Sequence, residues 1–242
     1  NFYSWLNSVI KHREDLISKA NTKLILSKLS KMKRTGTTTI GAISSYSFDL
    51  DACVKSPLNK VFFCEVIGTK GDMIDTLFAD FKDRLNIAKK YKSANFIPAI
   101  AIHSPYSVHP FLVRETLKLA REENLPVTSH FLESREEFEW LHKDEGAFVE
   151  FFKNFLGQEQ SVTKPMEFLN LFSNIKNLSF THCVEASSDD FEKIKSLGAS
   201  INHCVTSNRL LNNTKLDLEK LKDIPFTIGT DGLSSNNSLS MF

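Results

Sequence analysis

Seven short apolar segments, separated by helical patterns, constrain the fold of this 242-residue chain more than any other feature. They are typical of strands because β-branched and aromatic residues recur in them and glycine or polar residues bound them. The segments lie at 37–43, 61–67, 96–102, 126–129, 178–181, 199–202 and 225–229. Strands that alternate with helices in this way join into βα units, so we predict a parallel sheet.

The stretches between these strands carry the spacing of amphipathic helices. The clearest case is residues 74–85, whose apolar side chains fall on one stripe. Signals for helix starts and ends stand at His109-Pro110, Ser187 and Gly198. We expect helices at 2–16, in the segment ending at Lys33, at 74–85, from Pro110, around 140–152, at 165–171, from Ser187 to Gly198, and at 216–221.

A closed (β/α)8 barrel of the TIM type has eight strands, one more than the sequence contains. The chain opens at Asn1 inside a helical pattern and stops at Phe242 after a strand-and-loop signal. We therefore predict a truncated barrel, lacking its first strand and its C-terminal part, with residues 1–242 forming one domain. The alternative is an open doubly wound sheet, which would usually carry a glycine-rich phosphate loop after its first strand. The sequence has no such loop.

The composition excludes several classes of protein. Hydrophobic residues make up 41% of the chain and charged residues 24%, with a formal net charge of +1, which argues against disorder and against a protein that coats nucleic acid. Four dispersed cysteines form no CxxC pair, which favours a reducing, cytoplasmic setting. Apolar runs stay well short of the roughly 18 residues that a membrane span needs. We expect a soluble protein without nucleic-acid or membrane partners.

Polar residues stand where the last five predicted strands end. They are His103, His130, His182, His203 and Asp231. In (β/α)8 barrels the active site is built at the carboxyl ends of the strands. Imidazole and carboxylate ligands without thiolates suit zinc or another divalent metal. Each residue alone could instead be a hydrogen-bonded packing histidine or a turn cap, but the set together predicts a metal or substrate site.

The most specific local pattern is His130-Phe131-Leu132-Glu133 at the end of a strand. The imidazole of His130 can reach a metal while the Glu133 carboxylate, one turn on, hangs over a bound water. Glu133 could then carry protons, a role that contributes about 10²- to 10⁴-fold in rate. Without His130, Glu133 would be an ordinary exposed glutamate at a helix start. Asp231 can be a metal ligand and can also accept the proton of the nucleophile.

With those residues in hand, the chain resembles the amidohydrolase superfamily, in the branch that contains cytosine, adenosine-type and triazine hydrolases. The resemblance covers essentially all 242 residues. It rests on HSPYSV (103–108), SHFLES (129–134), THC (181–183), HCVTSNRLL (203–211) and GTDGLSSNNSLSMF (229–242). Within the branch, the aminodeoxyfutalosine deaminases are similar to it in WLNSVI (5–10), GAIS (41–44), SPLNKVFF (56–63) and EEFEWL (136–141).

The resemblance implies a role for each residue. His130 and Asp231 would bind one divalent metal, with Zn²⁺ expected and Fe²⁺ or Ni²⁺ as alternatives. Glu133 would shuttle protons and contact the substrate, His182 would hydrogen-bond the attacking water or the ring, and His103 would meet a ring nitrogen or the ribose. The family's His-x-His metal pair is absent from the sequence, which we attribute to truncation.

The role of His203 stays open, because the proline common after this His-Cys pair is Val205 here. We expect His203 at most to line the pocket.

The resemblance also implies an activity, namely hydrolytic deamination of an adenine-containing nucleoside, aminodeoxyfutalosine in menaquinone biosynthesis. Alternatives that keep the same metal core are S-adenosylhomocysteine, methylthioadenosine or guanine deamination, and dechlorination of a triazine. A catalytically inactive binding domain of the same fold is the alternative outside enzymes. The expected partner is a small-molecule nucleoside, and the resemblance implies a homodimer.

Overall fold

Seven parallel strands form one sheet in the computed structural model, which describes residues 1–212 and 214–241. Phe242, the last residue of the GTDG segment, lies outside the described residues. The strands are β1 (Thr39–Ser44), β2 (Asn59–Val66), β3 (Phe96–Ile102), β4 (Val127–Phe131), β5 (Leu178–His182), β6 (Ser200–His203) and β7 (Phe226–Ile228). All seven predicted strands are confirmed, with bounds that differ by two residues or fewer.

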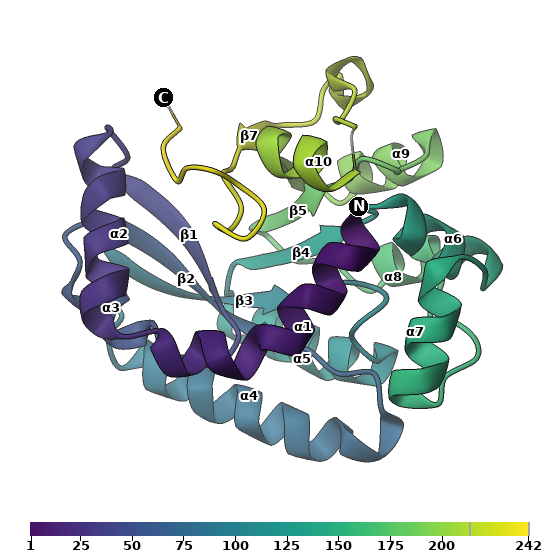
Figure 1. The fold of residues 1–242 in the computed structure, drawn as a ribbon, viewed down its shortest axis with the longest axis horizontal. Helices are drawn as coiled ribbons and strands as arrows, with labels where there is room; N and C mark the ends of the chain where they lie inside the picture. The colour runs from purple at the N-terminus through teal and green to yellow at the C-terminus, as the bar shows by residue number, and fades with distance from the viewer. Residues whose placement is uncertain (213, 242) are drawn as a thin grey trace.

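The strand order identifies the architecture. Each strand pairs in parallel with the next one along the chain, from β1 to β7. A doubly wound sheet would reverse its order partway across, so that alternative is wrong. The sheet curls as a barrel wall does, with helices around its convex side (Figure 1). Within the described residues β1 and β7 do not pair, so the wall stays open between them.

Ten α-helices and two 3₁₀ turns are formed by the described residues. The helices are α1 (Phe2–Lys19), α2 (Thr22–Arg34), α3 (Leu50–Lys55), α4 (Ile74–Lys89), α5 (Pro110–Glu123), α6 (Arg135–Lys143), α7 (Ala147–Leu156), α8 (Pro165–Asn170), α9 (Ser188–Ser196) and α10 (Val205–Asn212). The 3₁₀ turns are η1 (Gly71–Met73) and η2 (Leu218–Leu221). The predicted starts at Pro110 and near Ser187 are confirmed, with His109 and Ser187 as the N-caps.

Two expectations about helices need correction, and two helices were not predicted. The region around 140–152 is two helices, because Asp144 and Gly146 adopt left-handed φ angles of 56° and 85° and turn the chain between α6 and α7. The predicted helix at 216–221 is a single 3₁₀ turn. Helices α3 and α10 were not predicted, since both are short and neither has a long apolar stripe.

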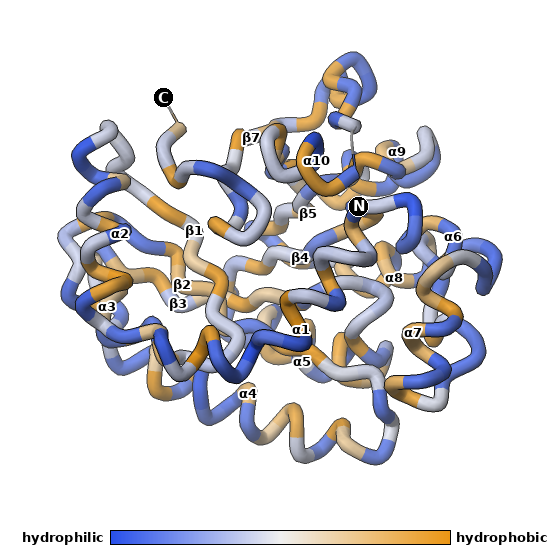
Figure 2. Tube along the Cα trace, viewed as in Figure 1, coloured by the Kyte–Doolittle hydropathy of each residue, from blue (hydrophilic) through white to orange (hydrophobic). Residues whose placement is uncertain are grey.

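The two faces of the sheet have different environments. On β2, Phe62, Cys64 and Val66 are at most 1% exposed and belong to the hydrophobic core, whereas Val61 and Phe63 line a cavity. This alternation follows from the two-residue period of a strand. Hydrophobic segments concentrate on the strands and on the inner sides of the helices (Figure 2). None of the described helices is long and apolar enough to cross a membrane.

Candidate active site

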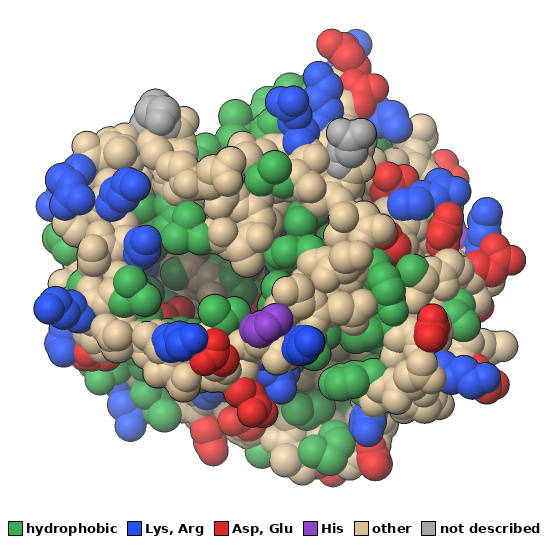
Figure 3. Space-filling model, in the orientation of Figure 1, with side chains coloured by type: hydrophobic (Ala, Val, Ile, Leu, Met, Phe, Trp, Pro, Cys, Tyr) green, Lys and Arg blue, Asp and Glu red, His purple; other side chains and the backbone are tan. Residues whose placement is uncertain are grey.

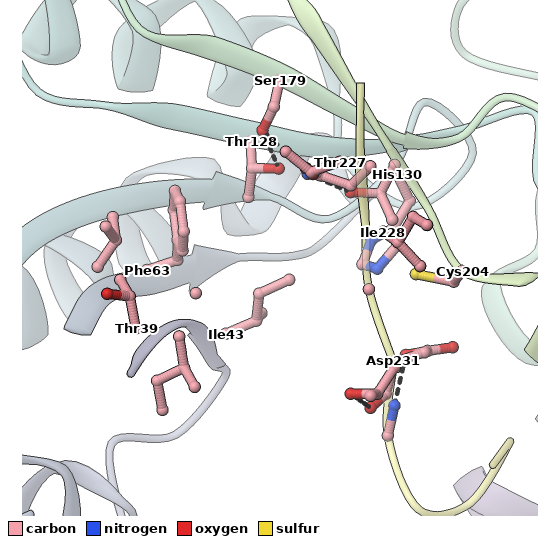
Figure 4. Close-up of a pocket in the computed structure, with 18 of the residues that line it drawn as sticks. Thr39, Ile43, Phe63, Thr128, His130, Ser179, Cys204, Thr227, Ile228 and Asp231 are labelled. Atoms are coloured by element: carbon pink, nitrogen blue, oxygen red, sulfur yellow. Dashed lines mark hydrogen bonds between the residues drawn. The ribbon is translucent and has the colours of Figure 1, made fainter. Parts of the chain in front are cut away.

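A cavity of about 710 Å³ lies against the inner face of the curled sheet. The space-filling view shows a hollow over β1 and β2 (Figure 3). In the close-up, Thr39 and Phe63 border one end of the cavity, and His130, Cys204 and Asp231 border the other (Figure 4). Residues from the seven strands or from the loops that follow them therefore line one open cavity.

The candidate residues form two sets, and within each set the ligand atoms lie within 4.8 Å of one another; His130 and Asp231 belong to different sets. We call Glu65, His103 and His130 the early-strand set, because they lie near the carboxyl ends of β2, β3 and β4. We call Glu133, His182 and Asp231 the late-strand set. The rings of His130 and His182 are stacked with centroids 5.4 Å apart, so the two sets adjoin.

One ring nitrogen of His130 is fixed by a hydrogen bond to the backbone, and the other is not used in that bond. Its Nδ1 lies 2.7 Å from the backbone oxygen of His103. A carbonyl oxygen can only accept, so Nδ1 carries a proton, and in the neutral ring the lone pair is therefore on Nε2. Metal-ligating histidines commonly have their other nitrogen fixed in this way. The geometry of His130 therefore fits a metal ligand.

Asp231 is held as a carboxylate. Its Oδ2 accepts hydrogen bonds from Ser207 Oγ at 2.6 Å and Ser235 Oγ at 2.8 Å, and its Oδ1 accepts from the amide of Gly232 at 2.7 Å. Burial raises the pKa of Asp231, but His182 and the two hydroxyl groups outweigh burial and the net shift is downward. His130 contributes to the same lowering. An ionised oxygen ligand and an imidazole that line one cavity suit a divalent cation.

His182, the last residue of β5, is oriented by an asparagine. Its Nδ1 donates to Asn208 Oδ1 at 2.8 Å, which leaves Nε2 as an acceptor 3.5 Å from Glu133 Oε1. Burial lowers the pKa of His182, so the ring is neutral near pH 7. A neutral imidazole with a free Nε2 can accept a hydrogen bond from water.

Glu133 is 6% exposed, and burial raises its pKa to about 8. His130 opposes that shift, whereas Asp231 adds to it. A carboxyl group with a pKa near neutrality can both give and take a proton under ordinary conditions. The late-strand set therefore combines a neutral imidazole, a carboxylate and a carboxyl group that titrates near pH 8.

His103 lies at the cavity with its Nδ1 turned toward hydroxyl groups. Ser104 Oγ lies 3.1 Å from that nitrogen, and Ser107 Oγ also contacts it. Burial lowers the pKa of His103 to about 4, so the ring is uncharged at neutral pH. An uncharged imidazole beside the cavity can hydrogen-bond a neutral ring of a substrate.

His203 does not line the cavity, whose described lining includes Cys204 instead. Its Nδ1 accepts a hydrogen bond from Asn208 Nδ2 at 3.3 Å, and its side chain is 3% exposed. Asn208 thus bridges the rings of His182 and His203. The expectation that His203 lines the pocket is therefore wrong, and its side chain instead contacts Asn208.

Sequence reasoning missed four residues of the site: Glu65, Glu137, Ser207 and Asn208. Glu65 lies inside an apolar strand and shares the cavity with His103 and His130. A lone carboxylate in an apolar run, two residues beyond the cavity-lining Phe63, is the signal that could have found it. The other three lie on helices and act by contact with residues far along the chain or one turn away.

A parallel α/β sheet that gathers imidazoles and carboxylates at its carboxyl edge defines a TIM-type barrel wall with a candidate metal site. Within that class, the chain belongs to the amidohydrolase family, whose sequence profile matches residues 2–242.

Two curated relatives match the whole chain. It is 48% identical over 242 residues to an aminodeoxyfutalosine deaminase from a Nitratiruptor species, covering 100% of this chain and 60% of that protein. It is 32% identical over 250 residues to an adenosine deaminase from Helicobacter pylori, again covering 100% of this chain and 60% of that protein. The chain thus spans about 60% of the length of these relatives.

Solved structures agree with the fold. The crystal structure of Helicobacter pylori aminofutalosine deaminase in complex with methylthio-coformycin matches with a TM-score of 0.91 and 29% identity, over 99% of this chain and 59% of that one. An atrazine chlorohydrolase from Arthrobacter aurescens, complexed with zinc, matches with a TM-score of 0.73 over 98% of this chain and 55% of that one. At 15% identity, this second likeness shows the fold alone.

Proposed function

We propose that the protein is a metal-dependent hydrolytic deaminase of an adenine-containing nucleoside, with aminodeoxyfutalosine in menaquinone biosynthesis as its substrate. The observation that carries the proposal is the late-strand set, in which Glu133, His182 and Asp231 present their reactive atoms within 4.8 Å of one another. The 48% identity to an aminodeoxyfutalosine deaminase supports the choice of substrate.

His130 and Asp231 would hold one divalent metal, for which we propose Zn²⁺, with Fe²⁺ and Ni²⁺ as alternatives. The free Nε2 of His130 and the ionised carboxylate of Asp231 support this assignment. When bound, such a metal makes water a stronger nucleophile at neutral pH. Removal of the metal with a chelator should abolish turnover, and adding it back should restore it.

The side chains would divide the proton transfers. Asp231 accepts one proton from the attacking water. Glu133 gives its own proton to the ring nitrogen next to the amino-bearing carbon. As the carbon–nitrogen bond breaks, Glu133 takes the remaining hydroxyl proton and passes it to the departing ammonia, and the proton held by Asp231 then returns to Glu133 for the next cycle. His182 accepts a hydrogen bond from the water through Nε2 and orients it. His103 contacts a ring nitrogen or the ribose and holds the base in place.

The test is product analysis with the full-length protein. We expect ammonia release together with an absorbance shift from adenine to hypoxanthine, greatest for aminodeoxyfutalosine among adenine nucleosides. Preferred turnover of S-adenosylhomocysteine, methylthioadenosine or guanine would replace the substrate assignment. Chloride release from a chlorinated triazine without ammonia would contradict it. Failure to convert any of these compounds would favour the inactive binding domain.

We also propose a cytoplasmic homodimer. The four cysteines are buried and unpaired, which suits a reducing compartment. The dimer rests on the family resemblance, and light scattering of the full-length protein would test it against a monomer.

A further inference from the structure

The turn that carries Glu133 has a conformation that its sequence does not favour. Leu132 has a φ of 44°, in the left-handed region where the Cβ of an L-residue comes close to the following carbonyl oxygen. Such a conformation persists where surrounding contacts impose it. Leu132 is fully buried and directly precedes Glu133, so whatever imposes the turn also sets the direction of the Glu133 side chain.

The two backbone oxygens of this turn accept hydrogen bonds from the amide of Glu185 and from Asn212 Nδ2, each at 3.0 Å, and one carboxylate holds its two amides. Glu137 accepts hydrogen bonds from the amide of Leu132 at 3.1 Å through Oε1 and from the amide of Glu133 at 2.8 Å through Oε2. Successive amides that point the same way form a concave site for an anion. Burial and the neighbouring Glu133 raise the pKa of Glu137, whereas the two amides lower it, and an amide donor on each of its two oxygens is the arrangement that the ionised form accepts. Glu137 is itself fixed, because it is 0% exposed and its amide donates to Ser134 Oγ at 3.2 Å.

The Glu133 carboxylate has little else to orient it. Within the part of the chain that the structure describes, its one polar contact is His182 Nε2, 3.5 Å from Oε1. That separation is too long for a good hydrogen bond. The direction of the side chain therefore depends on the backbone at Leu132 and Glu133, whose two amides are both held by Glu137.

We propose that Glu137 is a positioning residue for the proton shuttle, acting through the two amides that it accepts from. The inference rests on the proposed deamination. Glu137 does not touch the substrate in this account. Its carboxylate, with one oxygen for each amide, keeps Glu133 aimed at the space between His182 and the reacting atoms.

A double-mutant cycle on the full-length protein tests the proposal. A glutamine at position 137 has one acceptor oxygen, so it can serve one of the two amides. Glu137→Gln should lower kcat for ammonia release by about 10- to 100-fold, the effect of a misplaced catalytic group, with KM unchanged. In the Glu133→Gln background, Glu137→Gln should cause no further loss, because its effect passes through Glu133. Glu139→Gln, which breaks a surface pair with Arg135 in the same helix, is the matched control and should leave kcat unchanged.

If the double variant loses kcat by the product of the two single losses, the proposal is overturned. Such a result would mean that Glu137→Gln causes a general structural defect that acts independently of Glu133. A crystal structure of Glu137→Gln gives a readout independent of turnover, with Leu132 expected to leave the left-handed region. An unchanged turn would overturn the proposal as well. If Glu137→Gln fails to fold, Glu137→Asp keeps the charge but shortens the reach, and wild-type kcat in that variant would contradict the account. Wild-type protein that releases no ammonia would instead refute the proposed function, while the crystal structure still tests the turn.

Discussion

The early-strand set lines the cavity, whereas the late-strand set adjoins it and contributes Asp231 to the described lining, and the two sets are built differently. Glu65, His103 and His130 of the early-strand set have ordinary backbone conformations. In the late-strand set, His182 and Asp231 have left-handed φ angles of 75° and 59°, and Glu133 follows Leu132 at 44°. Strained backbone of this kind concentrates where a site must hold groups in a fixed arrangement. The late-strand set is therefore the half of the site that we assign to proton transfer.

The two sets also differ in whether their charge changes near neutral pH. Burial lowers the pKa of His103 to about 4, so this ring of the early-strand set stays neutral across the physiological range. Burial raises the pKa of Glu133 to about 8, so the late-strand set changes charge near neutrality. The comparison predicts that substitutions in the late-strand set reduce kcat and that His103, in the early-strand set, governs KM.

The largest effect should come from Glu133→Gln, which keeps the shape of the side chain but cannot carry a proton. We expect kcat to fall by about 10²- to 10⁴-fold while metal content is retained. Steady-state kinetics and elemental analysis of the full-length variant measure the two quantities. Near-normal turnover would remove Glu133 from the mechanism and erase the distinction between the sets.

The same substitution should change how stability depends on pH. In the unfolded chain Glu133 ionises at its ordinary value near 4.3, whereas burial in the folded state raises its pKa to about 8. The stability linked to its proton is complete below the ordinary pKa and is lost as pH rises through about 8. Urea unfolding at a series of pH values should therefore show wild-type stability declining more than that of Glu133→Gln. Parallel curves would contradict the raised pKa.

Asn208→Ala should have an intermediate effect, because it leaves His182 and His203 without their shared partner. A buried group that loses its hydrogen bond costs about 1–3 kcal/mol, so the free energy of unfolding should drop by that amount. We also expect kcat to fall, since His182 is free to turn. Asn170→Ala, at the exposed end of α8, is the control and should leave both quantities unchanged.

The smallest effect should come from His103 of the early-strand set. His103→Ala removes a neutral hydrogen-bonding group from the cavity, and we expect KM to rise by roughly tenfold, the worth of about one hydrogen bond, with kcat little changed. Initial-rate measurements over a range of nucleoside concentrations separate the two. A loss in kcat as large as that of Glu133→Gln would place His103 in the chemistry and break the comparison.

Much of this organisation could be predicted from the sequence, for physical reasons. Short apolar runs between helical patterns define parallel strands, and in parallel strands the following residues meet at one edge. His130, His182 and Asp231 could therefore be assigned to one site before their positions were known. Glu65 could not be assigned in this way, because it lies within an apolar run. Which face of the sheet it occupies depends on where β2 begins.

The supporting residues were harder to predict. Asn208 and Ser207 lie on α10, a helix whose polar start resembles a loop in the sequence. Glu137 belongs to an amphipathic helix, where an acidic residue is ordinarily exposed, and its contact with the amide of Leu132 depends on a left-handed turn that leucine does not favour. Such contacts arise from tertiary structure and leave no local signal.

The central claim is that His130 and Asp231 share one divalent metal. Anomalous diffraction from crystals of the full-length protein, collected at the absorption edges of zinc, iron and nickel, tests it most directly. We predict one strong peak about 2.0–2.2 Å from both His130 Nε2 and a carboxylate oxygen of Asp231, the distances of zinc–nitrogen and zinc–oxygen bonds. A metal bound by Glu65 and His103 without Asp231, or His130 and Asp231 too far apart to share an ion, would contradict the account.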